Sequence, residues 1–344
     1  MVLKRSALFV AAVVGLGAVS MSPSLSPSLY AQVPAKSITI MTWGTTWQSA
    51  LKSVSEEYTQ KTGVKVNVVT QSTSGEGLVK LQAMKSAPTI DVWFTTSSVA
   101  DRAITDTSLF AELPKSDMPS LKQLAPGIAT DRYVGVYSYP LSIVYRTDLV
   151  KTPPTSWKDL WDPRFKGQIG VPVMSSYQGR MLMIAAEVGG KPGDADTGFA
   201  ELKKLKPNVV MFYTSDATAR QSLAQGEVSV LVAPPSRAKQ VADAGIPVKV
   251  LSPKGTPMNM DVATLVNTPN KKLAADYLNF ILSKQANGEI AASLAMAPVN
   301  TSSPVPPSLV DALPKKGEAV VLDEKMINDH IDAWNQRFNS EIAQ

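Results

Sequence analysis

Short β-rich runs alternate with segments of helical periodicity along most of this chain, and this alternation limits the possible folds more than any other feature. The first β-rich run covers residues 37–43, and an amphipathic segment follows it at 47–62. Repeated strand–helix–strand units build a mostly parallel sheet with helices on both of its faces. The pattern therefore predicts an α/β protein.

The alternation continues in two series. In the first series we expect strands at 64–69 and 90–94, a helix at 77–85, and then two closely spaced strands at 133–137 and 143–145. In the second series we expect strands at 168–171, 209–212, 228–232 and 248–251, and helices at 177–188, 195–206, 217–225 and 236–244. A strand at 260–266 and helices at 271–283, 285–294 and 323–342 complete the prediction.

The chain is 344 residues long, which exceeds the usual size of a single hydrophobic core. We therefore expect two α/β lobes, joined by one crossover after residue 138 and by a return crossover before residue 260. Lobe one would comprise 36–138 plus 260–297, and lobe two 139–259 plus 298–344. The largest cleft should lie between the lobes, where the carboxyl ends of the strands face across the boundary.

The first residues have the pattern of a secretory signal. Lys4 and Arg5 are followed by an apolar stretch at 7–19, which is too short for a comfortable transmembrane helix. We expect a signal peptide at 1–31, with cleavage after Ala31 or as late as Ala35. The alternative is a retained membrane anchor. For a Gram-negative source, cleavage predicts a protein exported to the periplasm.

Composition excludes several classes of function. The chain has no cysteine, so disulfides, thiolate metal sites, cysteine nucleophiles and a lipid-modified cysteine are all excluded. Its net charge of +5 is spread along the sequence without a block of basic residues. Nucleic acid is therefore not an expected partner. No motif for a cofactor or metal is found, and we expect a monomer.

Several runs spread through the chain resemble one family. They are DVWFTTSS at 91–98, VYRTDLV at 144–150, PTSWKDLWDPRFKG at 154–167, QGEV at 225–228, AGIPV at 244–248, PKG at 253–255 and NFILS at 279–283. In this order they resemble the extracellular solute-binding proteins of the spermidine/putrescine-binding type. The resemblance implies a two-lobed type II periplasmic binding fold. It also implies a receptor that captures a small solute and delivers it to the membrane permease of an ABC transporter.

The resemblance also implies ligand contacts at two turns of lobe one. The turn after the first strand contains Trp43, Thr45 and Thr46, and the turn after the third strand contains Thr96, Ser97 and Ser98. Hydroxyl groups and free backbone N–H groups at helix starts can hold a polar or anionic group. The alternative role for Thr45, Thr46, Ser97 and Ser98 is helix capping.

In lobe two, the residues differ from those of the polyamine binders. Where the family has an acidic pair at the start of a helix, this chain has Ser175, Ser176 and Tyr177, followed by Arg180. Arg237 stands near a position where the family has Trp. An uncompensated guanidinium would repel a polyamine but bind a carboxylate or phosphate. We therefore expect an anionic or zwitterionic solute, while an ion pair within the protein is the alternative for each arginine.

The crossovers supply the remaining candidates. In the return crossover the family has Trp and Asp two residues apart, and this chain has Asn259 and Asp261, so only the acid is kept. Asp261 could orient an arginine or bind an amino group. Tyr139, in the first crossover, could stack on the solute or only pack the hinge.

Three other functions are alternatives to a receptor for an anionic or zwitterionic solute. A polyamine receptor with a rearranged pocket is the closest alternative, and a ferric-ion binder would need adjacent tyrosines, which do not occur. A serine hydrolase would use Ser49 with Lys52 or Ser236 with Lys239, but such S-x-x-K matches arise by chance. No G-x-S-x-G turn occurs in the sequence, so the only histidine, His330, has no such serine to pair with. We therefore expect no enzymatic activity.

Overall fold

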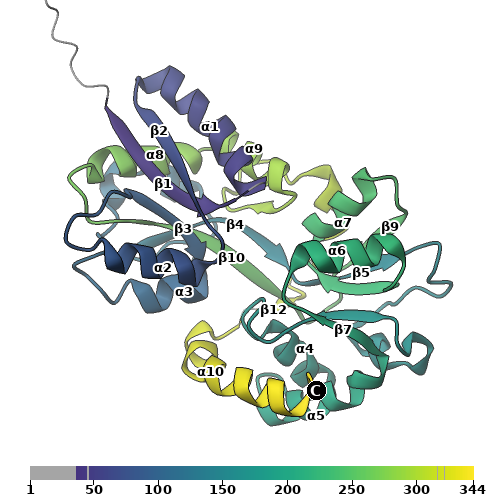
Figure 1. Ribbon diagram of the computed structural model, residues 1–344. Helices are drawn as coiled ribbons and strands as arrows, with labels where there is room; N and C mark the ends of the chain where they lie inside the picture. Colours follow the sequence, from purple (N-terminus) through teal and green to yellow (C-terminus); the bar gives the residue numbers. More distant parts are fainter. Residues whose placement is uncertain (1–35, 45, 316, 321) are drawn as a thin grey trace, which may run out of the picture. The chain divides into compact units, whose positions relative to one another are not determined.

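The computed structural model describes residues 36–44, 46–315, 317–320 and 322–344 (Figure 1). The predicted signal peptide and Thr45 lie outside these residues. Among the described residues, the strands form two sheets with helices packed on them. None of the helices in this part of the chain is long and apolar enough to cross a membrane.

The first sheet has the strand order β11-β4-β10-β3-β1-β2, with β12 beside β10. Its strands are β1 (Ser37–Trp43), β2 (Lys65–Gln71), β3 (Val92–Thr96), β4 (Tyr133–Pro140), β10 (Thr256–Leu265), β11 (Ala297–Pro298) and β12 (Ala319–Val320). Strand β1 lies between β2 and β3 and is parallel to both, as the βαβ pattern predicts. Strand β10 is antiparallel to β3 and β4, because it enters this sheet from the other lobe.

The second sheet has the order β7-β6-β8-β5-β9. Its strands are β5 (Ser142–Arg146), β6 (Ile169–Pro172), β7 (Val209–Tyr213), β8 (Val230–Ala233) and β9 (Val248–Leu251). Strand β6 is parallel to β7 and β8, and β5 is antiparallel to β8 and β9. Each sheet therefore combines a parallel part with an antiparallel part.

The chain passes between the sheets at the ends of β4 and β10. Strand β4 ends at Pro140 in the first sheet and β5 begins at Ser142 in the second, so Leu141 alone separates them. Strand β10 leads from β9 back to the first sheet, and its residues 258–260 pair with residues 138–140 of β4. The predicted two-lobed α/β fold is confirmed, with paired strands at the crossing.

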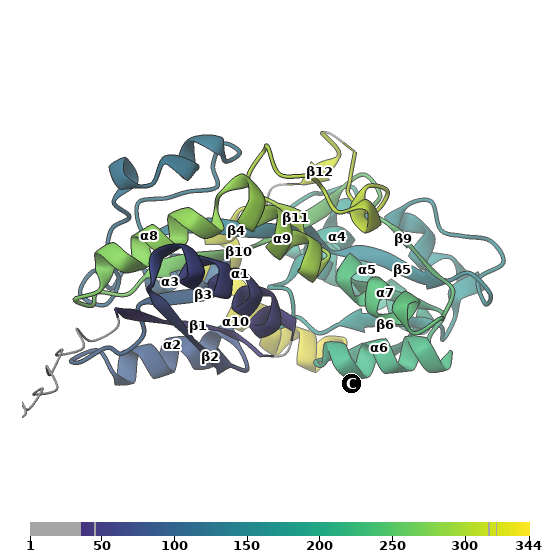
Figure 2. The same ribbon diagram turned by 90° about the horizontal axis from the view of Figure 1, so that it is seen from above.

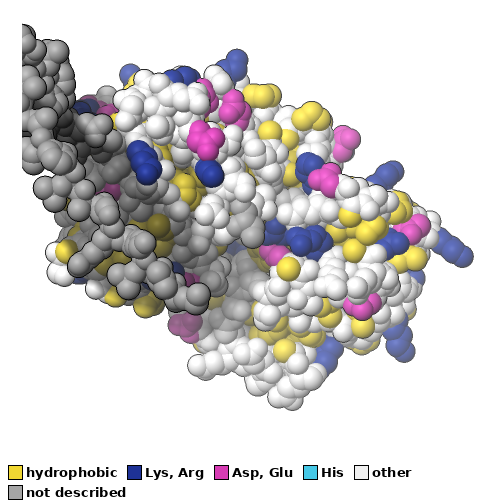
Figure 3. Space-filling view, turned by 45° about the horizontal axis from the view of Figure 1, so that its top comes forward, with side chains coloured by type: hydrophobic (Ala, Val, Ile, Leu, Met, Phe, Trp, Pro, Cys, Tyr) yellow, Lys and Arg dark blue, Asp and Glu magenta, His cyan; other side chains and the backbone are white. Residues whose placement is uncertain are grey.

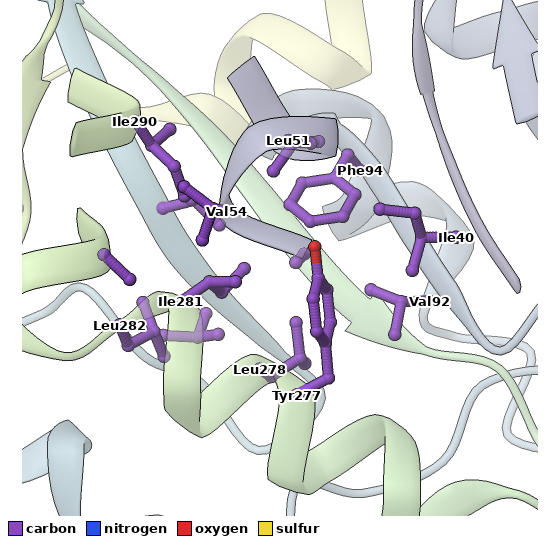
Figure 4. Close-up of a cluster of buried hydrophobic side chains, with 14 of the residues drawn as sticks. Ile40, Leu51, Val54, Val92, Phe94, Tyr277, Leu278, Ile281, Leu282 and Ile290 are labelled. Carbon is purple, nitrogen blue, oxygen red and sulfur yellow. The ribbon is translucent and has the colours of Figure 1, made fainter. Parts of the chain in front are cut away.

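Helices cover both faces of the first sheet. They are α1 (Thr46–Thr62), α2 (Ser74–Ala83), α3 (Ser97–Ala103), α8 (Lys271–Ile281) and α9 (Lys284–Leu294). Side chains alternate along each strand, so Val92 and Phe94 face α1, α8 and α9, while Trp93 faces the side of α2 and α3. Figure 4 shows the first of these clusters, in which the Tyr277 hydroxyl is hydrogen-bonded to Ser55 of α1 at 2.9 Å.

The second sheet is covered in the same way. Its helices are α4 (Arg180–Val188), α5 (Ala195–Leu205), α6 (Asp216–Gln225), α7 (Pro235–Asp243) and α10 (Glu324–Glu341). Val230 and Val232 of β8 pack with α4, α5 and α10, whereas Leu231 packs with α6 and α7. Helix α10 thus belongs to the core of lobe two. Its first turns nevertheless lie beside α3 of lobe one (Figures 1 and 2).

The start of α4 differs from the sequence prediction. The helix was expected from residue 177, but it begins at Arg180. The reason is a run of left-handed backbone, with φ of 56° at Tyr177, 50° at Gln178 and 71° at Gly179. Such a conformation is unfavourable for residues other than glycine and is often found at functional sites.

Candidate ligand-binding cleft

A cleft of about 1040 Å³ lies between the two lobes. Residues at the carboxyl ends of β1, β2 and β3 line it from lobe one, and residues that follow β6, β7 and β8 line it from lobe two. Parallel strands place their carboxyl ends at one edge of a sheet, and such edges form binding crevices. The fold therefore puts a polar cavity at the predicted lobe boundary.

The sequence-predicted site residues converge on this cleft. All of those that the structure describes line it, namely Trp43, Thr46, Thr96, Ser97, Ser98, Tyr139, Ser175, Ser176, Tyr177, Arg180, Arg237, Asn259 and Asp261. Their role in binding stays a prediction, because lining a cleft is not the same as contacting a solute.

The lobe-one wall combines aromatic rings with hydroxyl groups. The rings of Trp43 and Trp47 have centroids 5.9 Å apart. Thr96 occupies the N-cap position of α3, yet within the described residues its side chain makes no capping hydrogen bond. Its hydroxyl lies 3.5 Å from that of Ser98. The Thr96 hydroxyl therefore does not serve as a helix cap.

The lobe-two wall contains an arginine that is tied to a carboxylate. Arg237, on α7, donates from Nε and Nη2 to Oδ2 of Asp216 at 3.0 and 2.6 Å. The Tyr177 hydroxyl donates to the other oxygen of Asp216 at 2.6 Å. Burial raises the pKa of the Tyr177 hydroxyl well above its usual value, and nearby Tyr213 and Asp216 act in the same direction, so it remains a donor.

A second arginine is paired with the C-terminal helix. Arg180, only 2% exposed, donates from Nη2 to a carboxylate oxygen of Glu324 and from Nη1 to the Gln178 carbonyl at 3.3 Å. The Arg180 Nε and the second Glu324 oxygen are buried and have no partner among the described residues. The Arg180–Glu324 pair therefore leaves hydrogen-bonding capacity unused on both partners.

The guanidinium groups of both predicted site arginines are thus compensated by carboxylates. The expectation of uncompensated positive charge at Arg180 and Arg237 is wrong, because Glu324 and Asp216 lie against them. The ion-pair alternative for each arginine is what the structure contains. A compensated guanidinium still donates hydrogen bonds, but it favours a solute with little net charge over a strongly anionic one.

Asp261 supplies a buried carboxyl group to the lining of the cleft. It is 3% exposed, and in the part of the chain that the structure describes its Oδ1 has no hydrogen-bond partner. Burial raises the pKa of Asp261 to about 8, against the opposing effects of Tyr137, Tyr139 and the two arginines Arg237 and Arg180. At neutral pH the carboxyl is therefore mostly protonated.

Several residues of the cleft were missed by the sequence reasoning. They include Trp47, Gln71, Ser74, Asp216, Arg220 and Gln240, which line the cavity, and Glu324, which holds Arg180. Gln71 and Asp216 come at or just after strand ends, so the rule that the carboxyl ends of parallel strands share one edge could have found them. The position of Glu324 follows only from tertiary packing.

Other chemistry is not assembled in the described residues. They contain no group of acidic and histidine side chains that could hold a metal ion. In the S-x-x-K pair at the start of α7, Ser236 is buried while the Lys239 amine is exposed and bound to Asp243 at 2.6 Å. The Lys239 amine is therefore paired with Asp243 and not with Ser236.

The fold and the cleft together define the class of two-lobed solute-binding receptors. The chain belongs to the family of bacterial extracellular solute-binding proteins, whose model matches residues 53–316. The sequence-based assignment of a receptor for a small polar solute is thereby confirmed.

The relatives differ in the solutes that their names give. The gamma-aminobutyric acid-binding protein of Pseudomonas aeruginosa is 25% identical, over 91% of this chain and 93% of that protein. The spermidine/putrescine-binding periplasmic protein of Escherichia coli is 24% identical, over 72% of this chain and 74% of that protein. A solved ABC transporter structure from Clostridium perfringens is 26% identical, with a TM-score of 0.75, 89% of this chain covered and 99% of that one.

Proposed function

We propose that the protein captures a small zwitterionic solute, with an anionic group at one end and an amino group at the other. The observation that carries this proposal is the charge arrangement of the cleft, where the arginines Arg180 and Arg237 each have their own carboxylate and Asp261 has an unpartnered oxygen. Donors on the lobe-two wall would take the anionic group, and Asp261 would take the amine.

Charge balance supports a zwitterion over a polyamine. Among the described residues that line the cleft, the basic ones are Lys80, Arg102, Arg180, Arg220 and Arg237, and the acidic ones are Glu76, Asp216 and Asp261. A polycation would meet this basic excess with few free carboxylates. The similarity to a gamma-aminobutyric acid-binding protein along nearly the whole chain agrees with this choice.

The receptor would deliver its solute to the membrane permease of an ABC importer. We also propose that residues 1–31 or 1–35 are removed as a signal peptide and that the mature protein acts in the periplasm. Periplasmic relatives support this location. Mass spectrometry of the exported protein should give a mature chain that begins near Gln32 or Lys36, and recovery of intact Met1 in the soluble cell fraction would contradict export.

A thermal-shift screen tests the ligand class, because a solute that binds only the folded state raises the melting temperature. The probes are 4-aminobutyrate and 2-aminoethylphosphonate, with butyrate and butylamine as matched controls that each lack one charged end. Putrescine and spermidine represent the alternative. We expect a shift with a zwitterion and smaller shifts with either control. A shift with the polyamines alone would refute the zwitterion proposal and leave the receptor assignment intact.

A further inference from the structure

Two polar residues of α10 reach opposite walls of the cleft. Glu324 binds Arg180 of α4, which lines the cleft from lobe two. Asn328, one helical turn later, donates from Nδ2 to the backbone carbonyl of Ser98 at 2.9 Å, and Ser98 lines the cleft from lobe one. Residues four apart lie on the same side of a helix, so one face of α10 serves both walls.

The pairing is unusual because it leaves polar atoms unsatisfied. Arg180 Nε, the second oxygen of Glu324 and Asn328 Oδ1 are all buried, and none has a partner within the described ranges. Unsatisfied buried polar groups are rare in proteins and costly when nothing compensates them. Their presence at one junction indicates that the junction is kept for a role other than stability.

Core packing holds helix α10 firmly enough for its side chains to position residues of both walls. Ile327, Ile331, Trp334 and Phe338 are buried in the core of lobe two, so the helix cannot shift without disturbing that lobe. The outer face of its first turns is different. Lys325 and Asp329 form an exposed pair there at 2.6 Å, away from the cleft.

We propose that Glu324 and Asn328 are positioning residues for ligand binding. Glu324 compensates the charge of Arg180 and orients its side chain in one wall, and Asn328 holds the start of α3 in the other wall. This inference rests on the proposed function for the identity of the solute, but the juxtaposition itself does not depend on it. The C-terminal helix would thus help to select the charge of the solute and to fix the arrangement of the two walls.

The substitution Glu324→Gln tests the charge role. Glutamine keeps the size and one carbonyl oxygen but leaves the Arg180 charge uncompensated. We expect the affinity for 2-aminoethylphosphonate to rise relative to that for 4-aminobutyrate by roughly 10-fold, because the phosphonate carries more negative charge. A purely structural role would weaken both probes equally. Lys325→Ala, on the exposed side of the same helix, is the matched control and should leave the ratio unchanged.

The substitution Asn328→Ala tests the second contact without any ligand. The chain has no cysteine, so Val79→Cys on α2 and Ala242→Cys on α7 give one exposed labelling site in each lobe. The distance between two spin labels there should become longer or more broadly distributed in Asn328→Ala than in the parent or in Lys325→Ala. This measurement also covers the case in which Glu324→Gln fails to fold.

The outcomes separate this inference from the proposed function. If putrescine alone binds the parent, the zwitterion proposal fails, and Glu324→Gln should then weaken putrescine by added repulsion. If no probe binds the parent, the distance between the two spin labels still tests the positioning role of Asn328. Folded Glu324→Gln and Asn328→Ala proteins with parental probe selectivity and parental label distances would overturn the positioning role.

Discussion

The guanidinium carbon of Arg237, on the lobe-two wall, lies 5.3 Å from the centre of the Trp47 ring on the lobe-one wall. An arginine over the face of a tryptophan is attracted by the negative charge of the ring face. This contact joins the two lobes across the cleft, and a receptor of this kind must make or break such contacts when it closes or opens.

The variant Trp47→Ala should bind the solute about 5- to 30-fold more weakly, since it loses both the ring contact and apolar area, about 1–2 kcal/mol together. Trp47→Phe keeps a ring of weaker cation affinity and should be intermediate. Titration calorimetry with 4-aminobutyrate measures the change. Equal affinities in all three proteins would mean that the contact is irrelevant to binding.

Removal of the Arg237 side chain should have a larger effect. Arg237→Ala loses a charge-assisted donor and leaves Asp216 and Tyr177 without it, so we expect a loss of about 2–5 kcal/mol in binding a zwitterion, or roughly 30-fold to a few thousand-fold. Arg164→Ala, which alters an exposed arginine outside the cleft, is the control. Unchanged or improved binding of putrescine to Arg237→Ala would point to the polyamine alternative.

The stability of the empty protein should depend on pH through Asp261. Its pKa is about 8 in the folded state against 3.8 as the ordinary value, so the folded state keeps a proton that the unfolded state has lost. Stability is therefore lost as pH rises from about 4 to about 8. The Asp261→Asn variant has no carboxyl proton at this position, so this contribution to the pH dependence of stability is absent from it.

The variant minus wild-type difference in the free energy of unfolding should become more positive by about 1 kcal/mol or more between pH 5 and pH 8. Urea unfolding at several pH values measures this difference. A difference that is the same at all pH values would show that Asp261 is already ionised in the empty cleft.

Binding of an amine at Asp261 should release a proton. A positive charge beside the carboxyl favours its ionised form, so at pH 7 the group would change from mostly protonated to mostly ionised. Titration calorimetry of 4-aminobutyrate in two buffers of different ionisation enthalpy should give different heats at pH 7 and the same heat at pH 9. Asp261→Asn should show no buffer dependence at either pH.

Asn287 of α9 should be important for folding. Its side chain is fully buried, donates to the Val136 carbonyl at 2.7 Å and accepts from the backbone N–H groups of Val299 and Asn300, both at 3.0 Å. Asn287→Ala leaves these groups unsatisfied and should lower the free energy of unfolding by about 2–4 kcal/mol. Gln285→Ala, on the exposed side of α9, should change it little, and denaturant unfolding compares the two.

The fold could be predicted largely from local sequence pattern. The family resemblance pointed to Trp43 and Thr96, and both lie at the cleft because the carboxyl ends of parallel strands share an edge whatever the other details are. The same rule applied to lobe two would have found Asp216, which follows the correctly predicted strand β7.

What the sequence could not provide is the pairing of side chains. Arg180 and Glu324 are 144 residues apart, and no local signal links them. The left-handed backbone at Tyr177 and Gln178 is likewise imposed by the tertiary structure, since neither residue favours it. For this reason the residues of the cleft were easier to identify than their electrostatic state.

The crossing strands have a consequence for how the chain folds. The sheet of lobe one needs β10, and its core needs Tyr277, which bonds to Ser55 across 222 residues of sequence. The core of lobe two likewise needs α10. Contacts between such distant segments slow folding, because long loops must close before the contacts can form. A chain emerging from its first residue onward therefore cannot complete either lobe early, a delay that would suit the export proposed above.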